Sequence, residues 1–278
     1  MQLAKPKLSV SLKVALPNLR VALGLGEIPR VAFVGSGGKT TALFQLAREY
    51  TSPVIVTATS RLEIFQTKQA NFHFRFDETH GWNETMPTSI SGITLFSGHK
   101  GMRSVAGLEE GPLQEVLSLA DIASAPLLIE ADGSRRHPLK APDTHEPPIP
   151  QFVDTVVVVA GFSALGKPCT DSWVHRPEIY ARLSGLQIGE RISLTAIKNV
   201  LCHPLGGLKN IPNHARKVML LNQVDTPELF EKAEILAASL LPTFDCVVSA
   251  ALNSKNISPY ITNISDQESK QQGEMTPT

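Results

Sequence analysis

The chain contains 278 residues, of which 42% are hydrophobic, and its 26 basic side chains balance its 26 acidic ones. This length suits one large α/β domain or two small ones, and a net charge of zero argues against a broad nucleic-acid or membrane-surface role. The three cysteines (Cys169, Cys202 and Cys246) lie far apart and form no C-x-x-C, so neither a disulfide framework nor a zinc knuckle is indicated.

The N-terminal segment carries lysines but no long apolar run. We therefore expect neither a signal peptide nor a transmembrane helix, and a cytoplasmic protein. Residues Ser9–Val14 alternate between polar and apolar side chains, which predicts an edge strand. Asn18 then caps a short predicted helix, Leu19–Leu23, which Gly24 ends.

The most informative stretch joins an apolar strand, 31–34, to the glycine-rich turn G-S-G-G-K-T-T and a helix that runs to Glu49. This layout is typical of a phosphate-binding loop, in which backbone N–H groups and a helix N-terminus face an anion. Lys39 is then expected to reach the β- and γ-phosphates, and the Thr40 hydroxyl to ligate Mg²⁺. The predicted phosphate-binding residues are Gly35, Ser36, Gly37, Gly38, Lys39, Thr40 and Thr41.

This turn is two residues shorter than the common G-x-x-x-x-G-K-[ST] pattern, because its leading glycine is Gly35 and position 33 holds Phe33. Its form is similar to the G-T-x-G-K-T-T loop of the Mur-type peptide ligases. The structural alternative is an ordinary glycine-rich turn between a strand and a helix.

A second buried strand is predicted at 53–60, where Thr57 and Thr59 would lie at the ligand-binding edge or simply fill the strand. The pattern from 61 to 111 is mixed and predicts an insertion with short strands at 72–76 and 93–96. Apolar residues at helical spacing predict a helix over 112–123.

The stretch L-L-I-E-A-D-G-S predicts an apolar strand that delivers Glu130 and Asp132 at its C-terminal tip. A carboxylate at this place holds Mg²⁺ in phosphate-loop enzymes, directly or through water. Residues i and i+2 of a strand share a face, so the two carboxylates would repel each other unless a cation lay between them. Both are therefore predicted as catalytic and metal-binding residues. Lys39 is predicted as a further catalytic residue and Thr40 as a further metal ligand.

A long irregular segment, 135–150, follows, and its five prolines prevent a regular helix. Such a segment in a compact domain is usually functional, so we interpret it as an active-site loop for phosphates, a substrate or a metal. The alternative is a solvated loop with Arg–Glu pairs. The candidate residues are Arg135, Arg136, Lys140, His145 and Glu146, together with His175 and Arg176 from the polar stretch that follows a central strand at 155–161.

Helices are predicted near 178–183, at 189–201 and at 227–240. The stretch L-L-N-Q-V-D is similar to the N-K-x-D guanine-recognition element of GTPases, with Asn222 and Asp225 in the pairing positions and Gln223 in place of the lysine. In that element a buried aspartate pairs with guanine donors and would be left unpaired by adenine. A strand over 244–251 contains Ser249 and Ala250, which resemble the S-A-K element behind the guanine.

Six short sequence blocks, given at the end of this paragraph, make the chain resemble the YqeC family, which is described as accessory to selenium-dependent hydroxylases. The resemblance runs from about Leu19 to about Ile261. It implies a cellular role in the maturation of a selenium-dependent molybdenum hydroxylase more than it implies a reaction. The end of the Glu130 strand is also similar to that of metallochaperone GTPases that load nickel enzymes. The blocks that carry the resemblance are G-S-G-G-K-T-T, T-A-T-S, L-L-I-E-A-D-G-S, K-A-P-x-x-H-E-P, V-H-R-P-E and L-N-Q-V-D.

We therefore predict a three-layer, phosphate-loop NTPase-like α/β fold with a mostly parallel sheet, a single domain over 1–262 and a disordered tail over 263–278. The predicted function is a Mg²⁺-dependent nucleoside triphosphatase, with GTP favoured over ATP, whose partner is a molybdenum hydroxylase or another maturation factor. Two alternatives stay open: an ATP-dependent ligase or kinase, and a non-catalytic nucleotide-binding module.

Overall fold

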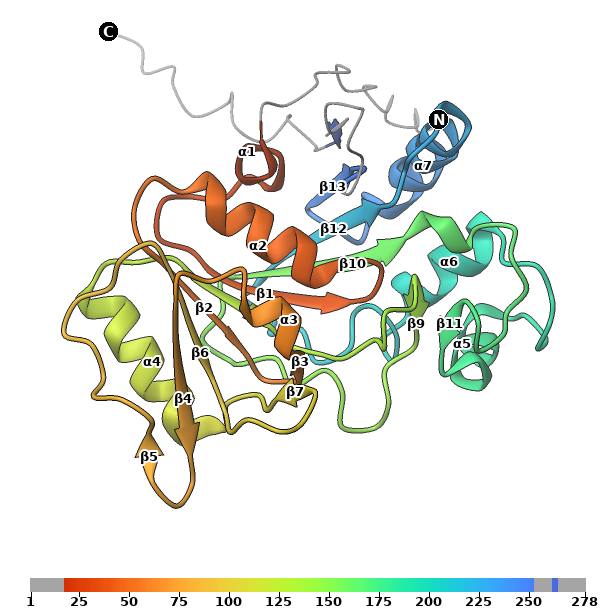
Figure 1. The fold of residues 1–278 in the computed structure, drawn as a ribbon. Helices are drawn as coiled ribbons and strands as arrows, with labels where there is room; N and C mark the ends of the chain where they lie inside the picture. The colour runs from red at the N-terminus through yellow and green to blue at the C-terminus, as the bar shows by residue number, and fades with distance from the viewer. Residues whose placement is uncertain (1–17, 253–261, 265–278) are drawn as a thin grey trace, which may run out of the picture.

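A ten-stranded sheet runs through residues 18–252 and 262–264, which are the residues that the computed structural model describes (Figure 1). Its strands pair in parallel except at its two ends, where β14 and β5 pair antiparallel. This confirms the predicted mostly parallel α/β architecture. The order is β14 (Thr262–Ile264), β13 (Cys246–Ser249), β12 (Arg216–Asn222), β10 (Thr155–Gly161), β1 (Arg30–Gly35), β8 (Leu127–Glu130), β2 (Val54–Ala58), β6 (Ile93–Ser97), β4 (Phe72–Asp77) and β5 (Gly81–Trp82).

Helices cover both faces of this sheet and make three layers. Side chains alternate along each strand, so Phe33 of β1 packs against one layer of helices and Val34 against the other. The first layer holds α1 (Leu19–Leu23) and α2 (Lys39–Glu49). The second holds α4 (Glu110–Ile122), α5 (Pro177–Ser184), α6 (Leu194–Leu201) and α7 (Pro227–Leu240).

Four smaller pieces lie at the carboxyl edge of the sheet. Strand β9 (Leu139–Lys140) pairs with β11 (Val174–His175), and β3 (Leu62–Glu63) pairs with β7 (Ser104–Val105). A single-turn helix, α3 (Ile64–Thr67), follows β3, and a short 3₁₀ helix, Phe162–Ala164, follows β10. In Figure 1, α3 lies beside the first turn of α2.

The strand order determines what can meet at this edge. Strand β1 lies between β8 and β10, and β12 and β13 follow β10. Because the carboxyl ends of parallel strands meet at one edge, the segments that follow these strands converge there. Glu130 continues the face of Leu128, which packs in the cluster with α2, so its side chain lies on the α2 side of the sheet.

Several predicted boundaries are wrong for identifiable reasons. The helix predicted at 189–201 begins at Leu194, because Ser193 caps it and Gly189 to Ile192 bond back to the segment 166–169. Strand β8 ends at Glu130, so Asp132 lies beyond the strand. The structure places β4 and β6, from the predicted insertion 61–111, in the central sheet.

Regular structure also extends into the segment predicted as a disordered tail. Strand β14 (Thr262–Ile264) pairs with β13, so the first two residues of 263–278 belong to the sheet. The predicted edge strand Ser9–Val14 lies outside the described residues. Among the helices that the structure describes, none is long and apolar enough to cross a membrane.

Phe33 tests the importance of the central strand for stability. Its ring is fully buried between β1 and the α1–α2 layer. We expect Phe33→Ala to lower the free energy of unfolding by about 3–5 kcal/mol, since the substitution leaves a cavity in a packed core. Urea denaturation followed by circular dichroism measures this. Phe72→Ala, at a strand residue that is 49% exposed, is the matched control, and an equal loss in both variants would contradict the account.

Candidate functional site

The glycine-rich turn after β1 adopts a conformation that only glycine allows. Gly35 and Gly37 have φ angles of 89° and 84°. A Cβ on Gly37 would lie 2.3 Å from the backbone N of Gly161, and one on Gly35 would lie 2.2 Å from the Val159 carbonyl oxygen. The loop backbone is therefore packed directly against the end of β10, which fixes its path.

The backbone N–H groups of this loop fall into two sets. Those of Gly35, Ser36 and Gly37 are used inside the protein: they donate to Asp132 Oδ2, the Val159 carbonyl and the His137 carbonyl. Those of 38–41 have no hydrogen-bond partner among the described residues, and Gly38 gives α2 no side-chain cap. An uncapped helix N-terminus with unpaired amides is a favourable place for an anion. The amides without a described partner thus span fewer residues than the predicted phosphate-binding stretch 35–41.

Lys39 begins α2, and its ammonium group is buried between two carboxylates. Its Nζ lies 3.1 Å from Asp132 Oδ1 and 3.9 Å from Glu130 Oε1, and donates to the Gly35 carbonyl at 2.7 Å. Ser134 Oγ is 3.3 Å away. The sequence requires a cation between the two carboxylates, and in this structure Lys39 supplies it.

Thr40 and Glu130 form the pair of oxygen groups that suits a metal ion. The Thr40 hydroxyl donates to Glu130 Oε2 at 2.5 Å, and both side chains are buried. Burial raises the pKa of Glu130, while the Lys39 charge and the Thr40 hydrogen bond oppose this effect and the Asp132 charge adds to it. No group of three or more His, Cys, Asp or Glu side chains able to hold a metal exists in the described residues. Mg²⁺ fits this sparse set, because it is commonly bound by one or two carboxylates, phosphate oxygens and water.

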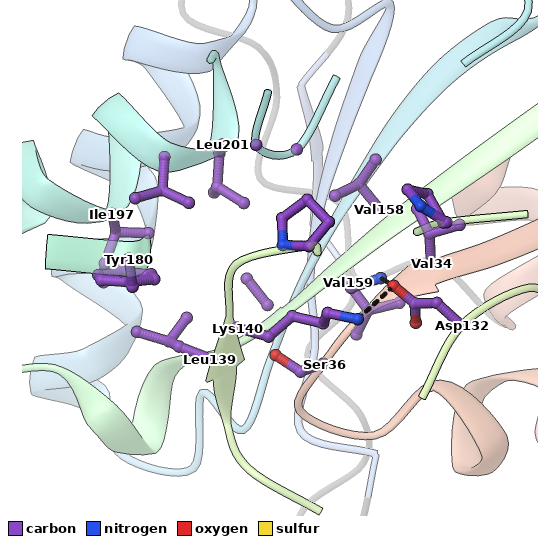
Figure 2. Close-up of a pocket in the computed structure, with 17 residues that line it drawn as sticks. Val34, Ser36, Asp132, Leu139, Lys140, Val158, Val159, Tyr180, Ile197 and Leu201 are labelled. Carbon is purple, nitrogen blue, oxygen red and sulfur yellow. Dashed lines mark hydrogen bonds and ion pairs between the residues drawn. The ribbon is translucent and has the colours of Figure 1, made fainter. Parts of the chain in front are cut away.

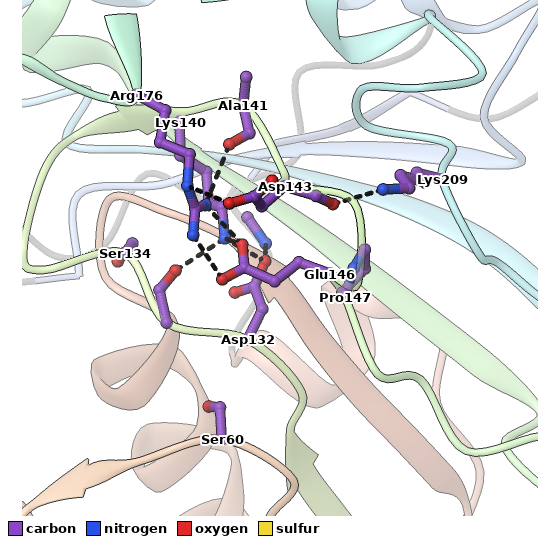
Figure 3. Close-up of polar contacts among 12 residues, drawn as sticks. Ser60, Asp132, Ser134, Lys140, Ala141, Asp143, Glu146, Pro147, Arg176 and Lys209 are labelled. Atoms are coloured by element: carbon purple, nitrogen blue, oxygen red, sulfur yellow. Dashed lines mark hydrogen bonds and ion pairs between the residues drawn. The ribbon is translucent and has the colours of Figure 1, made fainter. Parts of the chain in front are cut away.

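Three of the predicted substrate-loop residues bind one another instead of facing an open site (Figure 3). The Lys140 ammonium group uses three donors, on Asp132 Oδ2 (3.0 Å), the Gly133 carbonyl (2.7 Å) and Glu146 Oε2 (2.8 Å). The Arg176 guanidinium donates to both oxygens of Glu146, at 2.7 and 2.8 Å. This cluster fastens the segment 133–150 to the phosphate loop, and Arg–Glu pairing is the alternative that the sequence left open.

The other polar residues of this region differ in exposure. Arg135 and His145 are exposed, and neither side chain has a hydrogen-bond or ion-pair partner among the described residues. The Arg136 guanidinium pairs with Glu63 instead. The ring of His175 is buried and stacks on His137, with ring centroids 5.8 Å apart. Burial first, and then the charge of Arg176, lowers the pKa of His175 to about 4, so this imidazole is neutral at pH 7.

The N-x-x-D stretch lies directly behind the phosphate loop. Asn222 Nδ2 donates to the Gly37 carbonyl at 2.7 Å, and Asn222 Oδ1 accepts from the Leu252 N–H at 3.2 Å. Gln223 has a left-handed backbone (φ 62°), and its amide oxygen accepts from Ser163 Oγ. Asp225 is exposed. The sheet thus brings N-x-x-D to the phosphate loop, with Asn222 committed to the loop and Asp225 left open.

The predicted S-A segment supports this turn from the next strand. Ala250 N–H donates to the Leu221 carbonyl at 2.8 Å, and the Ala250 carbonyl accepts from Val224 N–H at 3.1 Å. Ser249 and Ala250 are both buried. Hydrogen bonds therefore connect the glycine-rich loop, the N-x-x-D turn and the S-A segment.

The hydroxyls of Thr57 and Thr59 face other partners. The Thr57 hydroxyl donates to the Phe96 carbonyl on the next strand, and that of Thr59 donates to the Pro148 carbonyl. Both are thus used to join elements of the fold, which is the strand-filling role that the sequence left open for them.

A small cavity lies under the phosphate loop, on the sheet face that carries α5 and α6 (Figure 2). Its volume is about 30 Å³. Asp132, Lys140 and Ser36 lie in its wall, and the Tyr180 hydroxyl in its lining has no hydrogen-bond partner among the described residues. This volume holds on the order of one or two water molecules, so the cavity cannot take a nucleotide.

Two further side chains meet this site that the sequence did not single out. Gln66 of α3 donates from Nε2 to the Thr40 hydroxyl oxygen at 2.8 Å, and Ser134 lies beside Lys39. Gln66 falls in the mixed segment 61–111, whose pattern predicts no link to the phosphate loop. Ser134 lies directly after the E-A-D-G stretch. Its closeness in sequence to Glu130 and Asp132 could have identified it as a candidate site residue.

Comparison with known proteins gives two matches. The family described as "YqeC protein" matches residues 31–178, which include the phosphate loop, Glu130, Asp132 and Arg176. The Escherichia coli (strain K12) protein named "Uncharacterized protein YqeC" is 32% identical over 209 residues, which cover 74% of this chain and 80% of that protein. No solved structure matches the chain significantly.

The Glu146 ion pairs predict how stability depends on pH. Burial raises the pKa of Glu146, but hydrogen bonds from Arg176 and Lys140 outweigh this and lower it from 4.5 to about 2. A depressed folded-state pKa contributes stability above the unfolded value, and this contribution is lost as pH falls toward the folded value. We therefore expect Glu146→Gln to be less stable than wild type at neutral pH, with the gap shrinking between about pH 5 and pH 2.

Urea denaturation across this pH range measures the gap. Glu231→Gln, at an exposed glutamate of α7, controls for the loss of one carboxylate and should show little gap at any pH. A wild-type–Glu146→Gln gap that stays constant with pH would contradict the assignment.

Proposed function

Given that the chain belongs to the YqeC family, we propose that it is a Mg²⁺-dependent nucleoside triphosphatase whose phosphates bind at the N-terminus of α2. One observation carries this proposal: the four amides at 38–41, which have no partner in the described part of the chain, adjoin the Lys39 ammonium group and the Thr40–Glu130 oxygen pair. Donors to an anion, a lysine ammonium group and hard oxygen ligands are components that phosphoryl transfer uses.

Each residue has a distinct part in this proposal. The amides and Lys39 hold the phosphates, and Lys39 exchanges its contact with Asp132 for phosphate oxygens. Thr40 and Glu130 would hold Mg²⁺, which supplies charge neutralisation of the β- and γ-phosphates when bound. Asp132 accepts from Gly35 N–H and Lys140, so it keeps the loop in place after Lys39 moves.

Asp225 supports guanine as the preferred base. Asn222 is occupied by the phosphate loop and Leu252, so it positions the turn and leaves base contact to Asp225. A carboxylate accepts from the two guanine donors, and adenine offers no such pair. The accessory role, assistance to the maturation of a selenium-dependent molybdenum hydroxylase, rests on the family resemblance alone.

The exposed Arg135 and His145 favour one other function. These two polar side chains are exposed and have no hydrogen-bond or ion-pair partner among the described residues, so they are free to bind an acceptor. An ATP-dependent ligase or kinase with a loop similar to that of the Mur-type peptide ligases would use Arg135 and His145 to bind the acceptor. Turnover would then require the acceptor, whereas a nucleoside triphosphatase releases phosphate without one.

Phosphate release from GTP and from ATP, with Mg²⁺ and with the purified protein alone, tests the proposal. We expect release in wild type and none in Lys39→Ala, because the other loop side chains are neutral and cannot replace this charge. Binding of a fluorescent GTP analogue should also be lost. Lys68→Ala, at an exposed lysine after α3, is the control for removal of a cation. Equal affinity and turnover in Lys39→Ala would exclude the phosphate loop as the site.

Glu130→Gln separates metal binding from nucleotide binding. The substitution keeps the shape of the side chain but removes the charge, so we expect turnover to fall much more than nucleotide affinity. A Mg²⁺ titration of phosphate release measures turnover, and the fluorescent GTP analogue measures nucleotide affinity. If Glu130→Gln hydrolyses at the wild-type rate throughout the titration, Glu130 is not a metal residue and Asp132 becomes the candidate.

Asp225→Asn tests the base preference. A charge-assisted hydrogen bond is worth about 1.5–3 kcal/mol, so GTP affinity should fall at least about tenfold. Binding of xanthosine triphosphate should improve, because xanthine presents an acceptor where guanine presents an amine, and ATP binding should barely change. Wild-type protein that binds ATP more tightly than GTP, with no effect of Asp225→Asn, would show that the N-x-x-D match is accidental.

A further inference from the structure

Helix α3 has an unusual attachment to the rest of the fold. None of its four residues is buried, so it gains little from apolar packing. The Glu63 side chain just before it pairs with Arg136, but this ion pair is exposed and contributes little. The Ile64 N–H at its start donates to the Arg103 carbonyl, and the Arg136 guanidinium lies over the Phe65 ring. Gln66 links α3 to the first turn of α2 through its hydrogen bond to Thr40. A segment built in this way is held mainly by polar contacts, and one of them reaches the phosphate loop.

The orientation of the Gln66 amide is fixed by its two neighbours. Its Oε1 accepts from the Glu63 N–H at 2.8 Å, as part of a capping box, which requires an oxygen on that side. The NH₂ group must then face Thr40, where Nε2 lies 2.8 Å from the hydroxyl oxygen. Reversing the amide would place a donor against a donor, so the network permits one orientation.

The Thr40 hydroxyl is constrained from two sides in consequence. A hydroxyl offers one hydrogen and two lone pairs. Its hydrogen goes to Glu130 Oε2, and one lone pair accepts from Gln66 Nε2. The second lone pair of the Thr40 oxygen remains unused, and the other two bonds set its direction. That lone pair is the one a metal ion would use.

We propose that Gln66 is the positioning residue of the metal site: it orients the Thr40 hydroxyl so that its remaining lone pair points at Mg²⁺ bound with the nucleotide. This inference rests on the proposed function. Gln66 itself touches neither metal nor phosphate in this account and acts through Thr40. Groups that orient a metal ligand commonly change metal affinity by about 10- to 100-fold when removed.

The test is the Mg²⁺ dependence of nucleotide binding, measured with a fluorescent GTP analogue in wild type and Gln66→Ala. We expect the Mg²⁺ concentration at the midpoint to rise at least about tenfold in Gln66→Ala. The affinity of Gln66→Ala for the GTP analogue in EDTA, without Mg²⁺, should stay within about twofold of the wild-type value. The helix amides and Lys39, which hold the phosphates, are unchanged in this variant. Gln69→Ala, which removes only a contact with Arg48, should leave the midpoint unchanged.

A double-mutant cycle shows whether Gln66 acts through Thr40. In a Thr40→Ala background, the Gln66→Ala substitution should have no further effect on the midpoint, since the group through which it acts is gone. A further rise of equal size in that background would overturn the proposal. So would an unchanged midpoint with slower turnover at saturating Mg²⁺, which would place Gln66 on the attacking water or the phosphate.

Two controls keep these outcomes separate from other failures. Thermal unfolding of each variant shows whether α3 is needed for folding, and a loss of affinity equal with and without Mg²⁺ would mean a structural role and overturn the proposal. If wild-type protein binds no nucleotide at all, the proposed function fails first. That result is distinct from a wild-type protein that binds normally and is indifferent to Gln66.

Discussion

The carboxylate of Asp132, buried between two lysines, is the interaction on which the rest of the site depends. It contacts Lys39 at 3.1 Å and Lys140 at 3.0 Å, and it accepts from the Gly35 N–H at 3.0 Å. These three partners belong to the helix after the phosphate loop, the segment 133–150 and the loop itself. One side chain thus joins the parts that would have to move together when a nucleotide binds.

This arrangement sets the energetic condition for binding. Removing one partner of a buried charge pair costs about 3–5 kcal/mol, because the other charge is left without compensation. In the proposed mechanism, Lys140 would stay on Asp132 when Lys39 left it for a phosphate, and Lys140 is itself balanced by Glu146. A Mg²⁺ ion beside Glu130 would restore the positive charge that Lys39 withdraws from that carboxylate. The cluster around Glu146 would therefore support the proposed site without contacting a nucleotide.

The sequence predicts the architecture well because local patterns determine it. Apolar strands, a glycine turn whose neighbours exclude a Cβ, and helices with one apolar face specify the three layers without further information. Local patterns do not predict which side chains bind one another. Lys140 and Glu146 are six residues apart, but Arg176 is thirty residues further along, and nothing local indicates that it closes the same cluster. Gln66 meets Thr40 only because β2 and β1 both lie beside β8. Such contacts depend on strand order, which the sequence alone leaves open.

The most direct test of the account is a crystal structure of the protein with Mg²⁺ and a non-hydrolysable GTP analogue. The account predicts that the Lys39 ammonium group leaves the Gly35 carbonyl and contacts the β- and γ-phosphates, with Asp132 still held by Lys140 and the Gly35 N–H. Phosphates should accept from the amides of 38–41. A nucleotide bound elsewhere, or Lys39 still on Asp132 and the Gly35 carbonyl with the phosphates remote from α2, would contradict it.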